Sequence, residues 1–518
     1  MKSVHSIMAA ILFATSVQAV AQEAEPQPQP AELPALVFLQ HVDSQSTPAA
    51  RLAALDQALT MLAQPTPFRG TVLCERAAIY DSLDRETEAL AGYEQCRQLR
   101  PNDPHVLFAL GFSEVVHKKV EQGAQRIIRA IELDPTWASY IDPEDLGTLQ
   151  RQLSYARAGL LSNRLNDALA KAGWGKENPS AFSAVVELAI RHRLEAGDKA
   201  GALELLSTVT APGPGVEMLV DRRYSAIWPE LERWAGEDLL VQRRAVLNGA
   251  TDTYQTAHSP TARLAYVNAL NNTGRVDDAI DELRRWSAET NANTDSFYHV
   301  QSIVMLGRLL GEQGRRSEGI ALMRAGLLAG DPKDRSTANI VPNLVTQLLL
   351  AEDYQGAAAI LDRYTPAEAG VEAPAALGYF VALKACAMQG LEDTGSAREA
   401  HDRVKTVYRA NNSAVQIVTN CVGSQDDQAA LWIETVKDED TRSAALVGLE
   451  TARYRAAQHL PIKTSAEKAL RGIAERTDIR AAFSKFARPL PDRYKAALVN
   501  FAGLPAEPVR HNMDGPVA

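Results

Sequence analysis

The sequence predicts an all-α solenoid of stacked helical hairpins, a fold that can divide into two superhelical segments. Three observations lead to this prediction. At 518 residues the chain is longer than the ~250–300 residues at which single hydrophobic cores stop growing. Alanine is frequent and runs of β-branched residues are scarce, which favours helices throughout. Helical patterns also recur at a nearly fixed interval, which is typical of a repeat array.

Residues 71–101, TVLCERAAIYDSLDRETEALAGYEQCRQLRP, show the repeating unit most clearly. Leu73, Ala77 and Tyr80 recur at helical spacing before the polar stretch DSLDRE interrupts the pattern. A second helix follows and ends at Pro101, and its apolar face is formed by Ala89, Leu90, Tyr93, Cys96 and Leu99. The stretch is therefore a helical hairpin, which must stack on neighbouring units to bury its remaining apolar face.

The segment after Pro101 repeats this design. Pro135 lies 34 residues after Pro101, and Ala130 lies 34 residues after Cys96. The two units resemble the tetratricopeptide repeat family, and the second matches its pattern at Leu107, Leu110, Gly111, Gly123, Ile127 and Pro135. In the first unit Arg76 replaces the usual leucine. The resemblance implies an α-solenoid whose first helices line a groove.

Later units are less regular. A small residue near the start of a second helix recurs at Ala279, Gly319, Ala358 and Ala397, at intervals of 40, 39 and 39 residues. Ala202 occupies the same place in an earlier unit. Because these intervals exceed 34, we expect longer helices or linkers and an imperfect superhelix.

The Pro/Gly cluster at 211–215 is the best candidate for a break between two arrays. We therefore expect the following organisation: a signal peptide at 1–21, a Pro-rich linker at 22–35, N-terminal repeats at 36–210 (clearest at 70–135), an irregular middle segment at 211–250, C-terminal repeats at 251–440, and a helical cap with a frayed tail at 441–518.

The first residues predict export to the periplasm. One lysine precedes an apolar run at 7–17, and Ala19-Val20-Ala21 provides small residues for cleavage near Ala21. The run is too short to cross a bilayer of ~30 Å as a helix. An uncleaved membrane anchor is the alternative interpretation. No later segment approaches a membrane-spanning helix in length and hydropathy.

The four cysteines are expected to form two disulfides. Cys74 and Cys96 are symmetric about the turn of one hairpin, which places them at the same level on two neighbouring helices. Cys386 and Cys421 are 35 residues apart, near one repeat length. Four cysteines allow three pairings, and we predict 74–96 with 386–421. Their spacing does not suit a zinc site or a Cys-x-x-Cys redox centre.

The sequence predicts no catalytic residue, cofactor or metal. The formal charge of −10 and the scattered arginine pairs argue against nucleic-acid binding. Ser465 and Lys468 fit a Ser-x-x-Lys motif, but its partner motifs are missing. Two interpretations remain for the aromatic residues Tyr224, Trp228 and Trp234: they form a surface that binds a ligand, or they belong to the hydrophobic core. The core interpretation is preferred, because Ile227 and Leu231 complete an apolar stripe at helical spacing.

The resemblance implies a protein-binding groove lined by the first helix of each unit. Its side chains would include His105, Phe108, Phe112, Leu264, Asn268 and Asn271. Phe108 and Phe112 lie one turn apart and would offer an apolar strip to a partner segment. The alternative is that both phenylalanines fill the seam against the preceding unit.

The predicted function is therefore a periplasmic scaffold or adaptor, not an enzyme, that binds a protein or peptide partner. The resemblance suggests roles in envelope assembly or polysaccharide export. One alternative is an enzyme that processes envelope polymer, or its accessory factor, with its chemistry in the middle or C-terminal region. A structural partner of an outer-membrane assembly is another.

Overall fold

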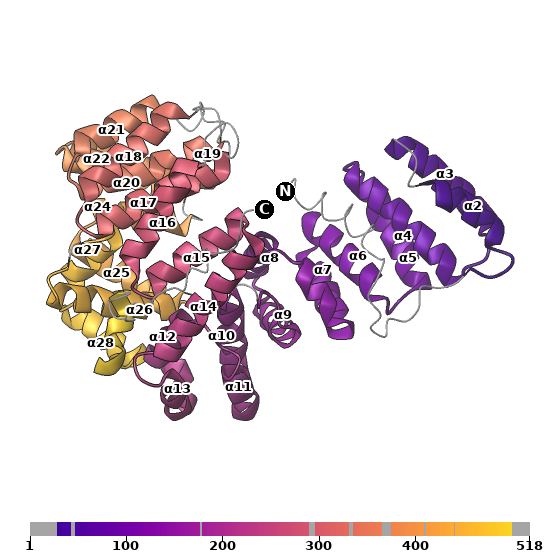
Figure 1. Cartoon of the computed structure of the whole chain (residues 1–518), viewed down its shortest axis with the longest axis horizontal. Helices are drawn as coiled ribbons and strands as arrows, with labels where there is room; N and C mark the ends of the chain where they lie inside the picture. Colours follow the sequence, from indigo (N-terminus) through magenta and orange to yellow (C-terminus); the bar gives the residue numbers. More distant parts are fainter. Residues whose placement is uncertain are drawn as a thin grey trace, which may run out of the picture. The chain divides into compact units, whose positions relative to one another are not determined.

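The computed structural model (Figure 1) describes most of the chain, in the ranges 28–42, 47–176, 179–289, 296–330, 335–364, 374–408, 411–439, 441–460 and 462–499. The expected signal peptide at 1–21, residues 22–27 of the expected linker and the tail from 500 onward lie outside the described residues.

Within the described residues the regular elements are helices, and an isolated bridge between Asp221 and Ala487 is the exception. Successive helices pack against each other in pairs, so the prediction of an all-α solenoid of helical hairpins is confirmed. The chain divides into two compact units, unit 1 (Met1–Val209) and unit 2 (Thr210–Ala518).

The described residues of unit 1 form three packed hairpins, then a short 3-10 helix and four further helices. Its elements are α2 (Leu33–Val42), α3 (Pro48–Met61), α4 (Pro67–Ser82), α5 (Glu86–Leu99), α6 (Pro104–Val116), α7 (Val120–Leu133), η1 (Pro135–Tyr140), α8 (Pro143–Tyr155), α9 (Gly159–Ala172), α10 (Pro179–Glu195) and α11 (Lys199–Leu206).

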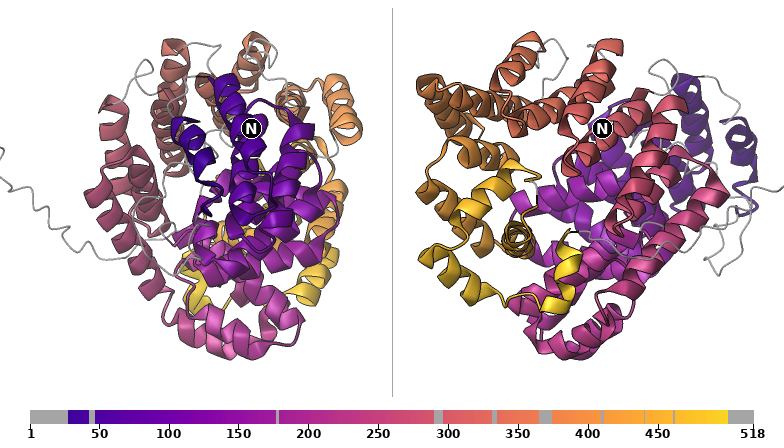
Figure 2. Two further views of the ribbon diagram at one scale, coloured as in Figure 1. Left: turned by 90° about the vertical axis from the view of Figure 1, so that its right-hand side faces the viewer. Right: turned by 60° about the vertical axis from the view of Figure 1, so that its left-hand side comes forward.

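Unit 2 continues the pairing of helices, which Figure 2 shows from two further sides. Its elements are α12 (Pro212–Val220), η2 (Arg222–Ile227), α13 (Trp228–Ala235), α14 (Leu240–Ala257), α15 (Pro260–Asn272), α16 (Val276–Glu289), α17 (Ser296–Glu312), α18 (Arg316–Ala329), α19 (Arg335–Ala338), α20 (Ile340–Leu350), α21 (Tyr354–Arg363), α22 (Pro374–Gly390), α23 (Thr394–Val407), α24 (Asn412–Val422), α25 (Gln425–Lys437), α26 (Arg442–Ala457), α27 (Ser465–Ile473), α28 (Thr477–Phe486) and η3 (Asp492–Val499).

One turn motif recurs between the paired helices of both units. After α4, Asp84 adopts a left-handed conformation with φ of 56°. The amide of Arg85 then donates a hydrogen bond to the carbonyl of Tyr80, and the amide of Asp84 donates to the carbonyl of Asp81, which together form a Schellman cap. The same left-handed residue and the same two bonds recur at Lys118, Arg157, Gly197, Gly274, Gly314, Glu352 and Glu392.

Small residues let the two helices of a hairpin approach closely. Gly123 of α7 faces Gly111 of α6, and Gly319 of α18 faces Gly307 of α17. The corresponding alanines are also buried, namely Ala89, Ala202, Ala279, Ala358 and Ala397. The recurring small residue in the sequence therefore marks a backbone contact.

Replacing Gly123 with alanine is expected to lower the free energy of unfolding of unit 1 by about 1–3 kcal/mol. A Cβ atom there would overlap the carbonyl oxygen of Gly111 and lie 2.7 Å from Cγ2 of Val115. The control is Gly147→Ala in α8, where the nearest atom to a Cβ is Nη1 of Arg151 at 3.5 Å. This control is expected to gain about 0.5–1 kcal/mol. Guanidinium unfolding of both variants measures the difference, and equal stability would contradict the proposed contact.

Two cysteine pairs lie at disulfide distance, in the pairing expected from the sequence. Cys74 and Cys96 join α4 to α5 with a Cα–Cα separation of 5.4 Å. Cys386 and Cys421 join α22 to α24 with a separation of 5.2 Å. Each pair lies within one unit, so each disulfide staples helices that already pack together.

The last helices of unit 2 pack against its first ones. Helix α12 contacts α26 and η3, and the amide of Arg488 donates to the carbonyl of Val220 at 3.0 Å. The guanidinium of Arg488 also lies 4.0 Å from the ring centre of Trp228. In Figure 1 the yellow C-terminal helices accordingly lie beside α12 and α13. The C-terminal segment that was expected as a cap therefore packs against the first helices of unit 2.

Candidate functional site

An aromatic cluster in unit 1 brings together residues of α6 and of the 3-10 helix η1. The rings of His105 and Trp137 stack with their centres 5.3 Å apart and 12° between their planes. Phe108 lies between Phe112, at 4.7 Å, and Trp137, at 5.1 Å. Tyr140 completes the cluster at 5.0 Å from Trp137. We call these five residues the aromatic platform.

The platform has a buried layer and a partly exposed layer. Phe108 and Phe112 are 4% and 8% exposed and support the other rings from below. His105, Trp137 and Tyr140 are partly exposed. The rings of Trp137 and Tyr140 on η1 lie against Phe108, and packing of the two phenylalanines against the preceding hairpin stays a prediction. The residues through which unit 1 can meet a partner here are His105, Trp137 and Tyr140.

Local capping fixes the position of η1 and therefore of its two aromatic side chains. Oδ1 of Asp134 accepts bonds from the amide of Thr136 at 3.0 Å and from its hydroxyl at 2.7 Å. At the other end of η1, the indole of Trp174 donates to the carbonyl of Ile141 at 2.7 Å. Asp142 caps the start of helix α8, and its Oδ1 accepts a bond from the amide of Asp145 at 2.7 Å. A platform fixed at both ends loses little entropy when a partner binds.

The second set of expected binding residues lies on α15 of unit 2. Leu264, Asn268 and Asn271 are all partly exposed, as expected for a surface-lining helix. They are not part of the aromatic platform, and a role for them in binding stays a prediction.

Helices α14, α15 and α16 share a polar cluster that the sequence did not single out. Tyr254 and Tyr266 stack with ring centres 5.3 Å apart. Arg263 forms an ion pair of 2.6 Å with Glu282, and both side chains are almost fully buried. Burial and the charge of Glu282 raise the pKa of Tyr254, so its hydroxyl stays protonated and donates to Glu282 at 3.3 Å. These contacts hold the three helices together. Among the four residues, the carboxylate of Glu282 is engaged by Arg263 and Tyr254.

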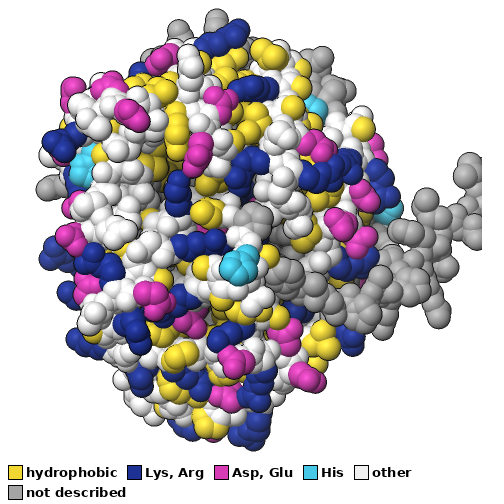
Figure 3. All heavy atoms as spheres, turned by 90° about the vertical axis from the view of Figure 1, so that its left-hand side faces the viewer, with side chains coloured by type: hydrophobic (Ala, Val, Ile, Leu, Met, Phe, Trp, Pro, Cys, Tyr) yellow, Lys and Arg dark blue, Asp and Glu magenta, His cyan; other side chains and the backbone are white. Residues whose placement is uncertain are grey.

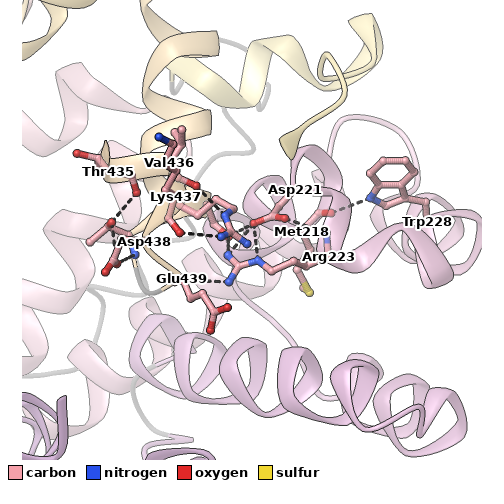
Figure 4. Close-up of polar contacts among 12 residues, drawn as sticks. Met218, Asp221, Arg223, Trp228, Thr435, Val436, Lys437, Asp438 and Glu439 are labelled. Atoms are coloured by element: carbon pink, nitrogen blue, oxygen red, sulfur yellow. Dashed lines mark hydrogen bonds and ion pairs between the residues drawn. The ribbon is translucent and has the colours of Figure 1, made fainter. Parts of the chain in front are cut away.

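The middle region contains a buried polar network (Figure 4). Asp221 is fully buried, and its Oδ2 accepts bonds from the guanidinium of Arg223 at 2.7 Å and from the hydroxyl of Ser443 at 2.9 Å. Arg223 also donates to the carbonyl of Glu439 at 2.6 Å. Burial and the neighbouring charge of Asp221 raise the pKa of Glu217. Because Asp221 is engaged by these donors, we interpret the network as a structural link between η2 and α26.

The aromatic residues of the middle region serve mainly as core. Tyr224, Ile227 and Leu231 are fully buried, in agreement with the preferred core interpretation. Trp228 is partly exposed, and its indole donates to the carbonyl of Met218 at 3.0 Å. Its ring is covered by Arg488, as described above, so these aromatic residues do not form an open platform.

Metal-binding groups and membrane-spanning helices are both absent from the part of the chain that the structure describes. No group of three or more His, Cys, Asp or Glu side chains there is arranged to hold a metal ion. No helix among those residues combines the length and hydropathy needed to span a bilayer. On the face of the molecule that Figure 3 shows, basic and acidic side chains are interspersed.

Sequence reasoning found part of the platform and missed its exposed centre. His105, Phe108 and Phe112 were expected on one helix face, whereas Trp137 and Tyr140 were not expected. A signal for them does exist, because Asp134-Pro135 is a typical helix start and the two aromatics follow at a spacing of three. That spacing places side chains on the same side of a 3-10 helix.

No family model matches the sequence, and no curated protein sequence matches it. Several solved structures are similar to the chain. The Naa15/Naa10 complex bound to HypK-THB is 14% identical, with 88% of this chain and 82% of that chain covered and a TM-score of 0.24.

Two further solved structures give comparable values. The TPR domain of P58(IPK) is 10% identical, with coverage of 75% and 98% and a TM-score of 0.19. The APC/C hetero-tetramer Cut9-Hcn1 is 10% identical, with coverage of 96% and 98% and a TM-score of 0.26. At such low TM-scores these likenesses define neither family nor function, and the fold class rests on the helix pairing of the chain itself.

Proposed function

We propose that the chain is a protein-binding scaffold or adaptor that holds a segment of a partner protein on the aromatic platform. The observation that carries the proposal is the partly exposed Trp137–Tyr140 pair, supported from below by Phe108. Tryptophan and tyrosine dominate binding energy at protein interfaces, because they offer large contact areas at a low entropic cost.

The position of the platform in the repeat supports the same function. Three of its residues lie on α6, the first helix of its hairpin, and the first helices line the groove in the repeat family that the sequence resembles. A helical or extended segment could lie along such a surface without rearrangement of the stacked helices. The array would then bring a bound partner to a fixed place, which is the task of an adaptor.

The compartment we propose is the periplasm. The expected leader at residues 1–21 supports export. Two cysteine pairs at disulfide distance support an oxidising compartment, because cytosolic proteins rarely keep structural disulfides.

Replacing Trp137 with alanine is expected to abolish capture of the partner. The mature chain would be immobilised and exposed to an envelope extract of its own cells, and retained proteins would be identified by mass spectrometry. A photo-crosslinking residue at position 140 would report direct contact with the same partner. Loss of a central aromatic anchor typically costs 2 kcal/mol or more of binding, about a thirtyfold loss of affinity.

The matched control is Leu160→Ala in α9, another large apolar side chain of unit 1 that is 79% exposed. It should retain the partner as the parent chain does, and circular dichroism should show that both variants keep their helices. A partner that is retained equally by Trp137→Ala and by the parent would show that the platform is not the docking site.

A further inference from the structure

We infer that the partner segment docking on the aromatic platform is basic, with lysine or arginine side chains that lie over Trp137 and Tyr140. This inference rests on the proposed function and adds the chemical class of the partner. Its basis is the charge around η1 and the finding that no lysine or arginine among the described residues lies over either ring.

The chain around η1 is acidic over a continuous stretch. Residues 132–145 have the sequence ELDPTWASYIDPED, which contains five acidic residues and no lysine, arginine or histidine. The two aromatic residues of η1 lie in the middle of this stretch. A partner that approaches Trp137 therefore meets the carboxylates of Asp134 and Asp142, which flank η1 and favour a cationic segment.

Two of these acids have no cationic partner in the described part of the chain. Asp134 and Asp142 flank η1 directly, and neither forms an ion pair with a described residue. Their hydrogen bonds fall on Oδ1, as given above, so Oδ2 of each carboxylate is available. Glu132 differs, because it forms ion pairs with Arg164 and Arg129.

Within the described residues, the rings of Trp137 and Tyr140 likewise have no lysine or arginine over them. Elsewhere the chain covers aromatic rings with its own cations, for example Tyr80 with Arg85 at 4.5 Å. In contrast, no lysine or arginine among the described residues lies over the ring of Trp137 or Tyr140. A cation over such a ring contributes about 0.5–1 kcal/mol at an exposed site, and tryptophan is the best acceptor. The two rings and the two carboxylates together form a surface complementary to a basic segment.

The test selects binding segments without assuming their sequence. A display library of random 12-residue segments is panned on the immobilised mature chain, and the enriched segments are synthesised with a fluorescent label. Their affinities are measured by anisotropy at low and high salt for the parent and for three variants. The variants are Trp137→Ala, Asp134→Asn with Asp142→Asn, and the control Asp198→Asn.

The double variant Asp134→Asn with Asp142→Asn removes two negative charges without removing the helix caps. Asparagine caps helices as well as aspartate does, so the hydrogen bonds at the starts of η1 and α8 are kept. Asp198 is the control, because it caps α11 in the same unit through the same kind of bond, to the amide of Gly201 at 2.8 Å. It also forms an ion pair with Arg193 at 3.6 Å, whereas Asp134 and Asp142 form none with a described residue.

We expect the enriched segments to carry net positive charge relative to the input library. Their affinity should fall about three- to tenfold in the double asparagine variant and at least about tenfold in Trp137→Ala. It should be unchanged in Asp198→Asn. The effect of the double variant should shrink at high salt, because salt screens exposed charges.

Two results would overturn the inference while leaving the scaffold function intact. One is enrichment of neutral or acidic segments that depend on Trp137. The other is enrichment of basic segments whose affinity is the same in the parent and in the double asparagine variant. If no segment is enriched and Trp137→Ala also leaves partner capture unchanged, the proposed function fails together with the inference.

Discussion

Replacing Asp221 with alanine is expected to lower the free energy of unfolding of unit 2 by about 3–5 kcal/mol. Asp221 is fully buried and accepts hydrogen bonds from Arg223 and Ser443. Its removal leaves the charge of Arg223, whose side chain is only 13% exposed, without its carboxylate. A buried charge that loses its partner costs far more than the pair itself contributes.

Two controls separate this effect from general sensitivity to mutation. Ser443→Ala removes one donor and keeps the ion pair, so it should cost about 1 kcal/mol. Asp281→Ala breaks an ion pair with Arg284 whose carboxylate is 69% exposed, and should change stability by less than about 1 kcal/mol.

Hydrogen exchange measured by mass spectrometry provides the most direct measurement, because it reports α12 and α26 separately. Faster exchange in both helices is expected for Asp221→Ala, since the network links the beginning of unit 2 to its end. A loss below about 1 kcal/mol, with α26 exchanging as in the parent chain, would contradict the structural role of the network.

The sequence predicts contacts well where they are local. Cys74 and Cys96 could be paired because the turn between them places them at the same level of two helices. The small residues of the second helices could be identified because they recur at a regular interval, and Gly123 and Gly319 prove to be close backbone contacts. In each of these cases the partner lies within one hairpin, so helical spacing is sufficient.

The aromatic platform shows where such reasoning becomes incomplete. Helical periodicity assigns Phe108 and Phe112 to one face of α6, but it cannot say what covers that face. The covering element is η1, which has six residues and is too short to show a period. Its capping signal and its two aromatics are visible in the sequence, yet only the structure shows that they lie over Phe108.

The closure of unit 2 could not be predicted from the sequence. Asp221 and Ser443 are separated by 222 residues, and neither belongs to a recognisable motif. Contacts of this length depend on the summed geometry of all the intervening hairpins, in which small deviations from an ideal repeat accumulate. The terminal segment was expected as a simple cap for this reason, because the local pattern contains no information about α12.

Replacing both Cys74 and Cys96 with alanine is expected to lower the free energy of unfolding of unit 1 by about 3 kcal/mol. The disulfide closes a loop with a sequence separation of 22 residues, so its loss lets the unfolded chain explore many more conformations. Alanine is preferred to serine here, because both cysteines are buried and a buried hydroxyl group needs a hydrogen-bond partner. Thermal unfolding followed by calorimetry, with and without reductant, measures the effect.

The second disulfide provides the matched control, because it lies in the other unit. The double variant Cys386→Ala and Cys421→Ala should destabilise unit 2 by a similar amount and leave the α4–α5 hairpin unchanged in hydrogen exchange. Reductant should destabilise the parent chain but have no further effect on the hairpin of the Cys74/Cys96 variant. If reductant leaves the parent unchanged while both thiols at 74 and 96 react with a maleimide in the native protein, the staple does not form. In that case the oxidising compartment would lose one of its two structural supports, and the periplasmic location would depend on the leader and on the Cys386–Cys421 pair.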